Sequence, residues 1–400
     1  MTFFNPYKNS YLQLNSQCHG VNPRLINRAV NAAMGWETDS HDKEPPLNRL
    51  ISNQATLPTT FNDAICRPQA FGKWALPKLI RELHSECPQT VSNAIDTIMD
   101  MVHYPEKAIE AIELRIVQRV MDLMQNPDAS IRERICIILN TLGHQQIGRE
   151  AICTSKLVLK SILDLLKDEV QVVRFRAAVL AQSLSDNFIS VFALIDFDYI
   201  TVIHQRILVE NDVVLVRLLK TMKNLIQAEG KNIAYSIGVF HTMVLLLKRT
   251  QVEILEETLL CLMILLTLKI AKKEAVKIFL LDTLYKLLCD TRTEVYTAAC
   301  GAVMNASHRT KAKKQSVEIV NMGLLDRLVV LMHDQFNPRA QMWSIRALTN
   351  LTEYPPNREY LQANHMKSIE RLNIGCKDKT SYDNIAEYYR KLLNVINWKP

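Results

Sequence analysis

The sequence predicts an all-α protein, a solenoid of stacked helical hairpins, from three observations. Apolar helical segments recur every 38 to 44 residues. The composition, 48% hydrophobic with only 10 glycines and 7% aromatic residues in 400, suits helices better than sheets. No Asn-Gly or Asp-Gly turn separates alternating apolar runs. Hairpins that repeat at this period must stack, because one hairpin cannot bury its apolar face alone. The leucines that mark the period are Leu83, Leu123, Leu165, Leu208, Leu246, Leu287 and Leu331.

Residues 1–70 differ from the remainder and are expected to form a largely extended N-terminal extension. They hold six of the 14 prolines and nine asparagines, and they lack the repeat. A segment this poor in apolar periodicity does not bury a core of its own. One short helix is expected there, with Asn22 as N-cap and Pro23 in the first turn.

Residues 71–400 form the predicted solenoid, right-handed and of about seven repeats. Its first helix carries apolar residues from Leu76 to Leu83 at spacings of three and four. Asx residues and prolines mark the later turns: Asn126-Pro127-Asp128, Asp168-Glu169, Asn211-Asp212, Asp290–Thr293 and Asn337-Pro338. After three turns an aliphatic residue, expected in the core, precedes an arginine, expected beside acidic turn residues: Ile131-Arg132, Val173-Arg174 and Val216-Arg217. The helix Asp383–Asn397 is expected to cap the stack.

The last two full units resemble armadillo repeats. One runs from Leu284 to Asn305 and the other from Met322 to Leu351. Each has a helix of small residues that ends in Asn-Ala or Asn-Leu, and a glycine precedes the second helix in the latter. A HEAT-like assignment is a close alternative and would change the architecture little.

A narrower resemblance rests on short motifs along residues 71–400. They are Phe71-Gly-x-x-Ala-Leu-Pro-Lys-Leu-x-x-Glu-Leu-x-Ser85, His103-x-Pro105-Glu106 with Glu110-Ala111, Gly148-Arg149, and Val395-Ile-x-x-Lys-Pro400. Together they resemble the radial spoke head protein 14 family, armadillo proteins of the ciliary and flagellar axoneme. The resemblance implies a structural subunit of the radial spoke that supports motility. It also implies other radial spoke proteins as partners, within a large hetero-complex of the axonemal cytoskeleton.

Several function classes find no support in the sequence. There is no glycine-rich phosphate loop, no G-x-S-x-G and no metal-ligand spacing, so no enzyme and no cofactor are expected. The net charge of +7 favours acidic partners over nucleic acid. The most apolar run, Leu259–Leu268, is too short to span a membrane. The N-terminus lacks a secretory signal and no C-x-x-C pair occurs, which predicts a cytoplasmic protein with reduced thiols. Four cysteines lie at apolar helical positions and are expected in the core: Cys136, Cys261, Cys289 and Cys300.

The third helices of an armadillo stack supply the first set of candidate binding residues. Importin-α-type receptors place a tryptophan four residues before a groove asparagine and bind basic peptides there. The asparagines of this chain are Asn140, Asn224, Asn305 and Asn350, and Cys136, Lys220, Gly301 and Arg346 stand four residues earlier. Two of those positions are cationic and none is tryptophan, so a receptor for basic peptides is disfavoured. The asparagines bind a partner's backbone, or they satisfy carbonyls of the neighbouring repeat.

Two basic connectors supply the second set. They contain Lys269, Lys272, Lys273 and Lys277, then Arg309, Lys311, Lys313 and Lys314. Stacking should bring them onto one edge, either as a docking patch for an acidic protein segment or as a solvated face. The sequence therefore favours a non-enzymatic axonemal scaffold, and the alternative is a soluble armadillo adaptor in trafficking or assembly of ciliary or other cytoplasmic complexes.

Overall fold

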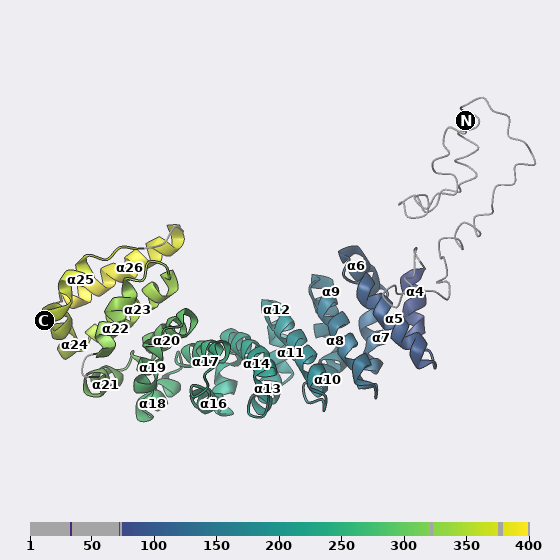
Figure 1. Cartoon of the computed structure of the whole chain (residues 1–400), viewed down its shortest axis with the longest axis horizontal. Helices are drawn as coiled ribbons and strands as arrows, with labels where there is room; N and C mark the ends of the chain where they lie inside the picture. Colours follow the sequence, from purple (N-terminus) through teal and green to yellow (C-terminus); the bar gives the residue numbers. More distant parts are fainter. Residues whose placement is uncertain (1–32, 34–71, 73, 321–322, 375–378, 399–400) are drawn as a thin grey trace, which may run out of the picture. The chain divides into compact units, whose positions relative to one another are not determined.

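A computed structural model describes residues 74–320, 323–374 and 379–398, with the single residues 33 and 72. Throughout these residues the regular structure is helical and no strand occurs (Figure 1). The predicted all-α solenoid is confirmed. The N-terminal extension and the helix expected after Asn22 lie outside the described residues, except that Ala33 is helical and exposed.

The chain divides into two compact units, Met1–Ala151 and Ile152–Pro400, and the boundary falls inside helix α9. The described helices of the first unit are α4 (Ala75–Glu82), α5 (Pro88–Met101), α6 (Pro105–Glu113), α7 (Ile116–Met121), the 3₁₀ helix η2 (Asp122–Gln125), α8 (Ala129–Gly143) and the start of α9 (Gln146–Thr154).

The helices of the second unit continue the same order. They are α10 (Lys156–Leu165), α11 (Gln171–Ser185), α12 (Phe188–Asp196), α13 (Tyr199–Ile207), α14 (Asp212–Leu225), the π-helical turn η3 (Ile226–Gly230), α15 (Lys231–Ser236), α16 (Val239–Leu246), α17 (Val252–Leu265), α18 (Lys269–Lys277), α19 (Leu280–Leu288), α20 (Thr293–Ala306), α21 (Thr310–Val320), α22 (Gly323–Met332), α23 (Pro338–Thr352), α24 (Pro355–Asn364), α25 (Met366–Glu370) and α26 (Lys379–Ile396).

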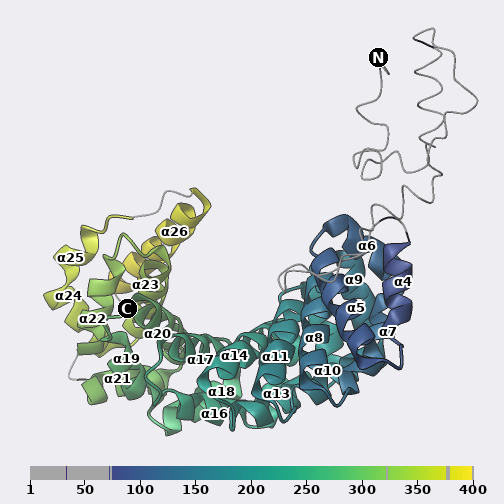
Figure 2. The same cartoon turned by 45° about the vertical axis from the view of Figure 1, so that its right-hand side comes forward.

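Each repeat consists of two short helices and a longer third helix. Within the described residues this pattern occurs seven times, from α6–α7–α8 to α24–α25–α26, and the pair α4–α5 precedes it. In the second unit the third helices α11, α14, α17, α20, α23 and α26 pack each against the next (Figure 2). The second helices α10, α13, α16, α19 and α22 each pack on the third helix of their own repeat. The apolar side chains between two neighbouring third helices are therefore buried only when both repeats are folded.

The C-terminal helix α26 caps the stack, as the sequence predicts. It packs on α23, and its own side chains Ile385, Leu392 and Ile396 are buried. Tyr389 lies at the edge of this contact, and its hydroxyl donates to the Ile369 carbonyl over 2.9 Å.

Asx residues and prolines begin several of the third helices. The Oδ1 atoms of Asp128, Asn211 and Asn337 accept backbone N–H groups two or three residues later, at 2.9, 3.1 and 3.1 Å. Pro88 and Pro338 occupy first-turn positions, where no helical N–H partner is needed. The predicted turns are confirmed at these three boundaries.

In four repeats the turn between the first and second helices has a left-handed backbone. Arg115, Asp198 and Phe279 have φ of 59°, 60° and 52°, and Gly238 has φ of 92°. Each directly precedes a second helix: α7, α13, α19 and α16, respectively. Only the glycine adopts this conformation without steric cost.

Two of the marker leucines do not lie in the core. Leu208 is 60% exposed, because α13 ends at Ile207 and that isoleucine is buried instead. Leu287 is half-buried, whereas Leu288 is fully buried. A helix turns its side chains by about 100° per residue, so a one-residue error in phase moves a side chain to another face.

The third aliphatic–arginine pair, Val216-Arg217, lies two residues later in its helix than the other two pairs do. Ile131 and Val173 are buried three residues after their N-caps, as predicted, but the residue at that position of α14 is Val214. Arg132 and Arg174 each donate through Nη1 to two backbone carbonyls of the preceding turn. The arginines therefore close the turns mainly through backbone oxygens.

Three of the four cysteines expected in the core are buried: Cys136, Cys261 and Cys300. Burial raises the pKa of the Cys261 and Cys300 thiols. Such thiols are poor nucleophiles. Cys289 is exposed, because α19 ends at Leu288 and Cys289 lies in the turn beyond it.

Candidate protein-binding surfaces

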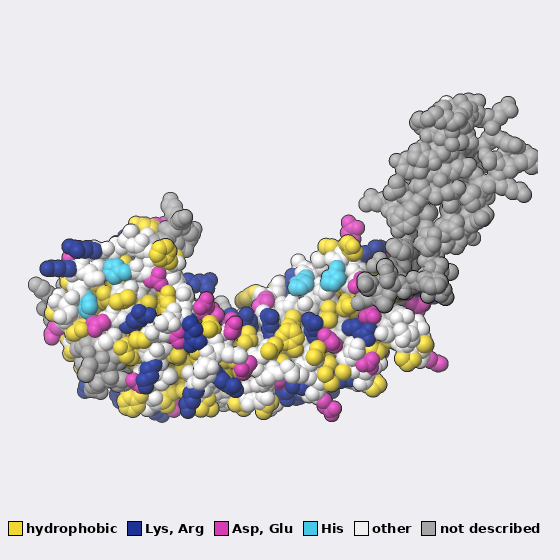
Figure 3. Space-filling view, in the orientation of Figure 1, with side chains coloured by type: hydrophobic (Ala, Val, Ile, Leu, Met, Phe, Trp, Pro, Cys, Tyr) yellow, Lys and Arg dark blue, Asp and Glu magenta, His cyan; other side chains and the backbone are white. Residues whose placement is uncertain are grey.

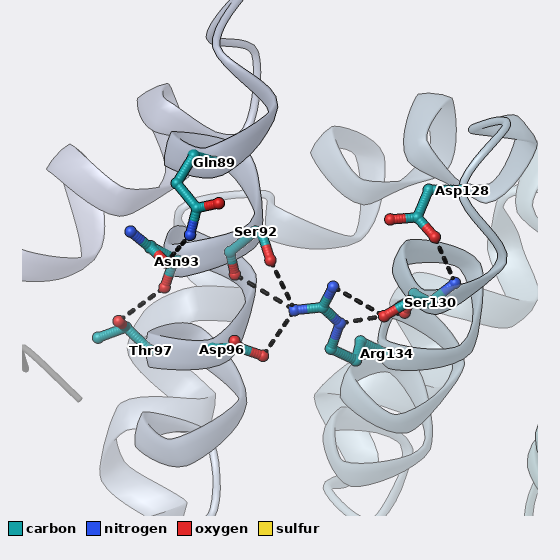
Figure 4. A network of polar contacts seen from close by, with 8 residues as sticks. All are labelled: Gln89, Ser92, Asn93, Asp96, Thr97, Asp128, Ser130 and Arg134. Carbon is teal, nitrogen blue, oxygen red and sulfur yellow. Dashed lines mark hydrogen bonds and ion pairs between the residues drawn. The ribbon is translucent and has the colours of Figure 1, made fainter. Parts of the chain in front are cut away.

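Polar side chains join neighbouring third helices in the first unit. Arg134 of α8 donates through Nη1 to Asp96 Oδ1 over 2.8 Å and to Ser92 Oγ over 3.0 Å, both on α5 (Figure 4). Its Nη2 reaches Ser130 Oγ over 3.0 Å on its own helix. The guanidinium is thus occupied between two helices and serves their packing.

An arginine at the equivalent position of α14 makes a similar link in the second unit. Arg217 donates to Gln182 Oε1 of α11 over 3.1 Å, and its guanidinium carbon lies 5.9 Å from the Phe175 ring centroid. Both arginines stand six residues after the N-cap of their helix. This position of the repeat therefore ties one third helix to the one before it.

Three of the four candidate asparagines donate to the preceding repeat. The Nδ2 of Asn305 donates to Met263 O over 2.7 Å, and that of Asn350 to Met304 O over 2.8 Å. Asn224 donates to Ser185 Oγ and Asp186 Oδ1. These amide groups hold the third helices together, so a partner's backbone could reach them only by displacing those contacts.

Asn140, in the first unit, has a different environment. Its Oδ1 is buried and has no hydrogen-bond partner among the described atoms. The Cys136 side chain one turn earlier is fully buried. Asn140 is partly exposed as a whole, but its carbonyl oxygen is not available to a partner.

The cationic residues one turn before the other asparagines are also engaged. The Arg346 guanidinium lies 4.6 Å from the Tyr388 ring centroid on α26. Lys220 of α14 lies near Glu256 of α17. Burial and the neighbouring Glu257 raise the pKa of Glu256, and Lys220 and Lys223 partly oppose that change. Lys223 forms an ion pair with Glu257 over 2.8 Å. This face therefore carries both signs of charge.

Trp343 is a residue of this face that the sequence analysis missed. A Cβ placed on Gly301 would lie 2.5 Å from Met263 Sδ and 3.1 Å from a ring carbon of Trp343. The side chains of α17 and α23 thus close over Gly301 of α20, which is why that position is glycine. Trp343 stands seven residues before Asn350, two helical turns rather than the one turn expected from importin-α-type receptors.

The two basic connectors form α18 and α21, and the structure brings them together. Gln315 of α21 donates through Nε2 to Val276 O of α18 over 2.8 Å. Burial and the charge of the nearby Arg309 lower the pKa of Lys272. We call the surface formed by the seven accessible or partly accessible cations of these two segments the basic edge. Its residues are Lys269, Lys272, Lys273, Lys277, Arg309, Lys311 and Lys314.

Lys313 does not belong to the basic edge, contrary to the prediction. It is 5% exposed and forms an ion pair with Glu353, which follows α23. The next residue, Lys314, is exposed. Adjacent side chains of a helix point about 100° apart, so Lys313 faces the next repeat while Lys314 faces solvent.

Four lysines of the basic edge are exposed and have no ion-pair partner among the described side chains: Lys269, Lys273, Lys311 and Lys314. Lys277 pairs with Glu274 over 3.2 Å. Apolar side chains accompany these cations, since Ile270 is 60% exposed on α18 and Phe279 is 55% exposed in the turn that follows. The edge therefore offers uncompensated positive charge beside exposed apolar surface.

Charges of both signs occur on the surface of the molecule. On the face drawn in Figure 3, basic and acidic side chains are interspersed with hydrophobic ones.

Within the described residues no group of three or more His, Cys, Asp or Glu side chains could hold a metal ion. No single described helix is long and apolar enough to span a membrane; α12 and α13 pass that test only as a pair bent by 83°.

Comparisons with known proteins identify the fold. No protein-family model matches the sequence, and no curated protein does. An engineered protein solved by the Northeast Structural Genomics Consortium matches with a TM-score of 0.69 at 20% identity, over 80% of this chain and 78% of its own. A designed armadillo repeat protein matches at 0.52 with 14% identity, over 58% and 99%. Another, in complex with the peptide (KR)4, matches at 0.51 with 16% identity, over 58% and 99%.

These similarities show an armadillo-like α-solenoid. At 20% identity or less, the likeness concerns the fold alone.

Proposed function

We propose that the protein is a non-enzymatic scaffold whose basic edge binds an acidic segment of a partner protein. The observation that supports this most directly is the group of four exposed lysines on α18 and α21 without ion-pair partners among the described side chains. Positive charges held together by packing repel one another, and an acidic ligand relieves that repulsion. Ile270 and Phe279 supply apolar contact area beside them.

The third-helix face is the less favourable binding surface. Its asparagine amides already donate to neighbouring repeats, and Arg217 and Arg346 are packed on aromatic rings. A designed armadillo protein is known in complex with the basic peptide (KR)4. The basic edge would repel such a peptide, which favours an acidic partner there, whereas the third-helix face carries charges of both signs.

We further propose that this scaffold is a subunit of the axonemal radial spoke. The support is the set of short motifs along residues 71–400 that resemble the radial spoke head protein 14 family. The partners would be other spoke proteins, and the acidic segment would belong to one of them or to a tubulin tail. The location would be the axoneme of a cilium or flagellum, where the protein supports motility.

Detergent extraction of cilia tests the axonemal proposal. A tagged full-length chain expressed in ciliated cells should remain with the microtubules after the membrane and soluble matrix are removed. The same chain with Lys269, Lys273, Lys311 and Lys314 changed to Glu should be retained less. A protein that is fully extracted by detergent would instead be a soluble adaptor, and the spoke assignment would be lost.

A further inference from the structure

An open pocket of about 400 Å³ lies between the second helices of the last two repeats, and no residue of the basic edge lines it. Its lining consists of His333, Lys367, Ser368 and Arg371. His333 directly follows α22, Lys367 and Ser368 belong to α25, and Arg371 directly follows it. Three nitrogen-bearing side chains and one hydroxyl therefore converge on one space.

Buried contacts fix the two walls of this pocket. Gln341 of α23 is fully buried, and its Nε2 donates to Met332 O over 2.9 Å and to Asn373 O over 3.0 Å. Met332 precedes His333 by one residue, and Asn373 follows Arg371 by two. Across the pocket, His333 Nε2 lies 3.0 Å from Ser368 Oγ in a hydrogen bond. The cationic residues thus stand on a backbone whose position is set by the core.

Among the described residues no carboxylate lines the pocket, and the two carboxylates nearest to it in the described sequence are Asp334 and Glu370. Asp334 accepts from the Tyr296 hydroxyl over 2.7 Å and from the Phe336 N–H. Glu370 lies close enough to Tyr389 of α26 to raise the pKa of that phenol, after the larger effect of burial. Lys367 and Arg371 form no ion pair within the described residues. Two positive charges, those of Lys367 and Arg371, therefore line the pocket without an ion-pair partner among the described residues.

The geometry points to a binding site for a phosphate monoester on a serine or threonine side chain of a partner protein. The Arg371 guanidinium can donate two parallel hydrogen bonds to phosphate oxygens, and Lys367 adds a compact charge. The Ser368 hydroxyl and the His333 ring supply further donors. The pocket is open on one side, so it cannot enclose a small free anion, whereas a bound peptide chain would cover the opening.

This site is independent of the basic edge, and a binding experiment separates the two. The probe is a fluorescently labelled glycine-rich peptide with one phosphoserine, compared with its unphosphorylated form by anisotropy against the full chain. Phosphorylation should strengthen binding. The double change Lys367→Ala with Arg371→Ala should weaken phosphopeptide binding at least about tenfold, because charge-assisted hydrogen bonds are lost. The matched change Lys269→Ala with Lys273→Ala should leave it unaltered.

Thermal melts of both variants control for folding. Both variants should have the melting temperature of the unaltered chain, because the four substituted side chains are exposed. The inference is overturned if the two peptides bind equally or if the Lys367–Arg371 variant retains the preference for phosphoserine. It is also overturned if the basic-edge variant loses that preference to the same degree. Inorganic phosphate that binds as tightly as the phosphopeptide would assign the pocket to a free anion instead.

Discussion

Glu210 is a buried carboxylate that joins two arginines near the start of α14. Its side chain is 1% exposed, and its Oε1 accepts from Arg174 Nε over 2.8 Å and Arg206 Nε over 3.0 Å. Arg174 also closes the turn before α11 through Asp168 O and Glu169 O. One carboxylate therefore stabilises the ends of two successive repeats.

Glu210→Gln should lower the free energy of unfolding by about 3 kcal/mol, because the partly buried guanidiniums lose their counter-charge. Urea denaturation followed by circular dichroism measures the change. The control is Lys286→Ala, which removes an exposed ion pair with Asp282 and should leave the midpoint nearly unchanged. Equal midpoints for the two variants would show that the Glu210 contacts contribute no more than a surface pair.

Phe279 adopts a strained backbone at a position where Gly238 is unstrained in the preceding repeat. Phe279→Gly should raise the free energy of unfolding by about 1 kcal/mol, since φ of 52° costs a non-glycine residue energy. Gly238→Ala should lower it by a similar amount, as a Cβ there meets no atom within 4 Å and only backbone strain is added. Changes of the same sign in both melts would refute this reading of the turn.

Asp290 links stability to pH. The side-chain hydrogen bond from Arg292 lowers the pKa of Asp290 from 3.8 to about 2. The folded state therefore favours the carboxylate, and this contribution is present above about pH 4 and lost as pH falls toward 2. The melting temperature of Asp290→Asn should lie below that of the unaltered chain at pH 6, and the gap should close near pH 2. A gap that is constant across this range would exclude the ion pair as its source.

At the scale of the helix, the identity of the core side chain decides the stability of a repeat. Leu288 of α19 is fully buried, whereas its neighbour Leu287 is half-buried. Leu288→Ala should cost about 2–5 kcal/mol by opening a cavity, and Leu287→Ala should cost clearly less. Parallel urea titrations of the two variants compare them. A larger loss for Leu287→Ala would contradict the observed phase of the helix.

The elements that the sequence predicts well are those with local signals. Asp128, Asn211 and Asn337 cap helices through N–H groups two or three residues away, so the signal and its partner lie in the same segment. The period of the repeat is equally visible, because it recurs seven times. The sequence indicates less clearly which residues of a short second helix face the core. At Leu208 and Leu287 the prediction is wrong by one residue.

Contacts between repeats could not be predicted from one sequence. Lys313 pairs with Glu353, 40 residues later, and so leaves the basic edge. Trp343 covers Gly301, 42 residues earlier. The pocket between α22 and α25 depends on Gln341, which reaches residues of two repeats. Each contact requires the register between neighbouring repeats, which depends on side-chain packing rather than on the period.

At the scale of the molecule, the second unit carries two positively charged surfaces of different construction. The basic edge consists of first helices of adjacent repeats and presents exposed lysines beside apolar side chains. The pocket near Arg371 lies between second helices and has buried support. The asparagines and arginines of the third helices instead form contacts between neighbouring third helices. Partner binding is therefore expected on the first and second helices.

The binding of a labelled poly-glutamate peptide to charge-reversed proteins tests this account most directly. One variant changes Lys269, Lys273, Lys311 and Lys314 to Glu. The control changes four exposed lysines elsewhere in the second unit, Lys156, Lys160, Lys167 and Lys248, and takes the net charge from +7 to −1 in the same way. Anisotropy at low ionic strength and at about 0.15 M salt should show that only the basic-edge variant loses affinity and most of the salt dependence. Equal losses in both variants, or none in either, would reduce the basic edge to a solvated surface and contradict the proposed scaffold mechanism.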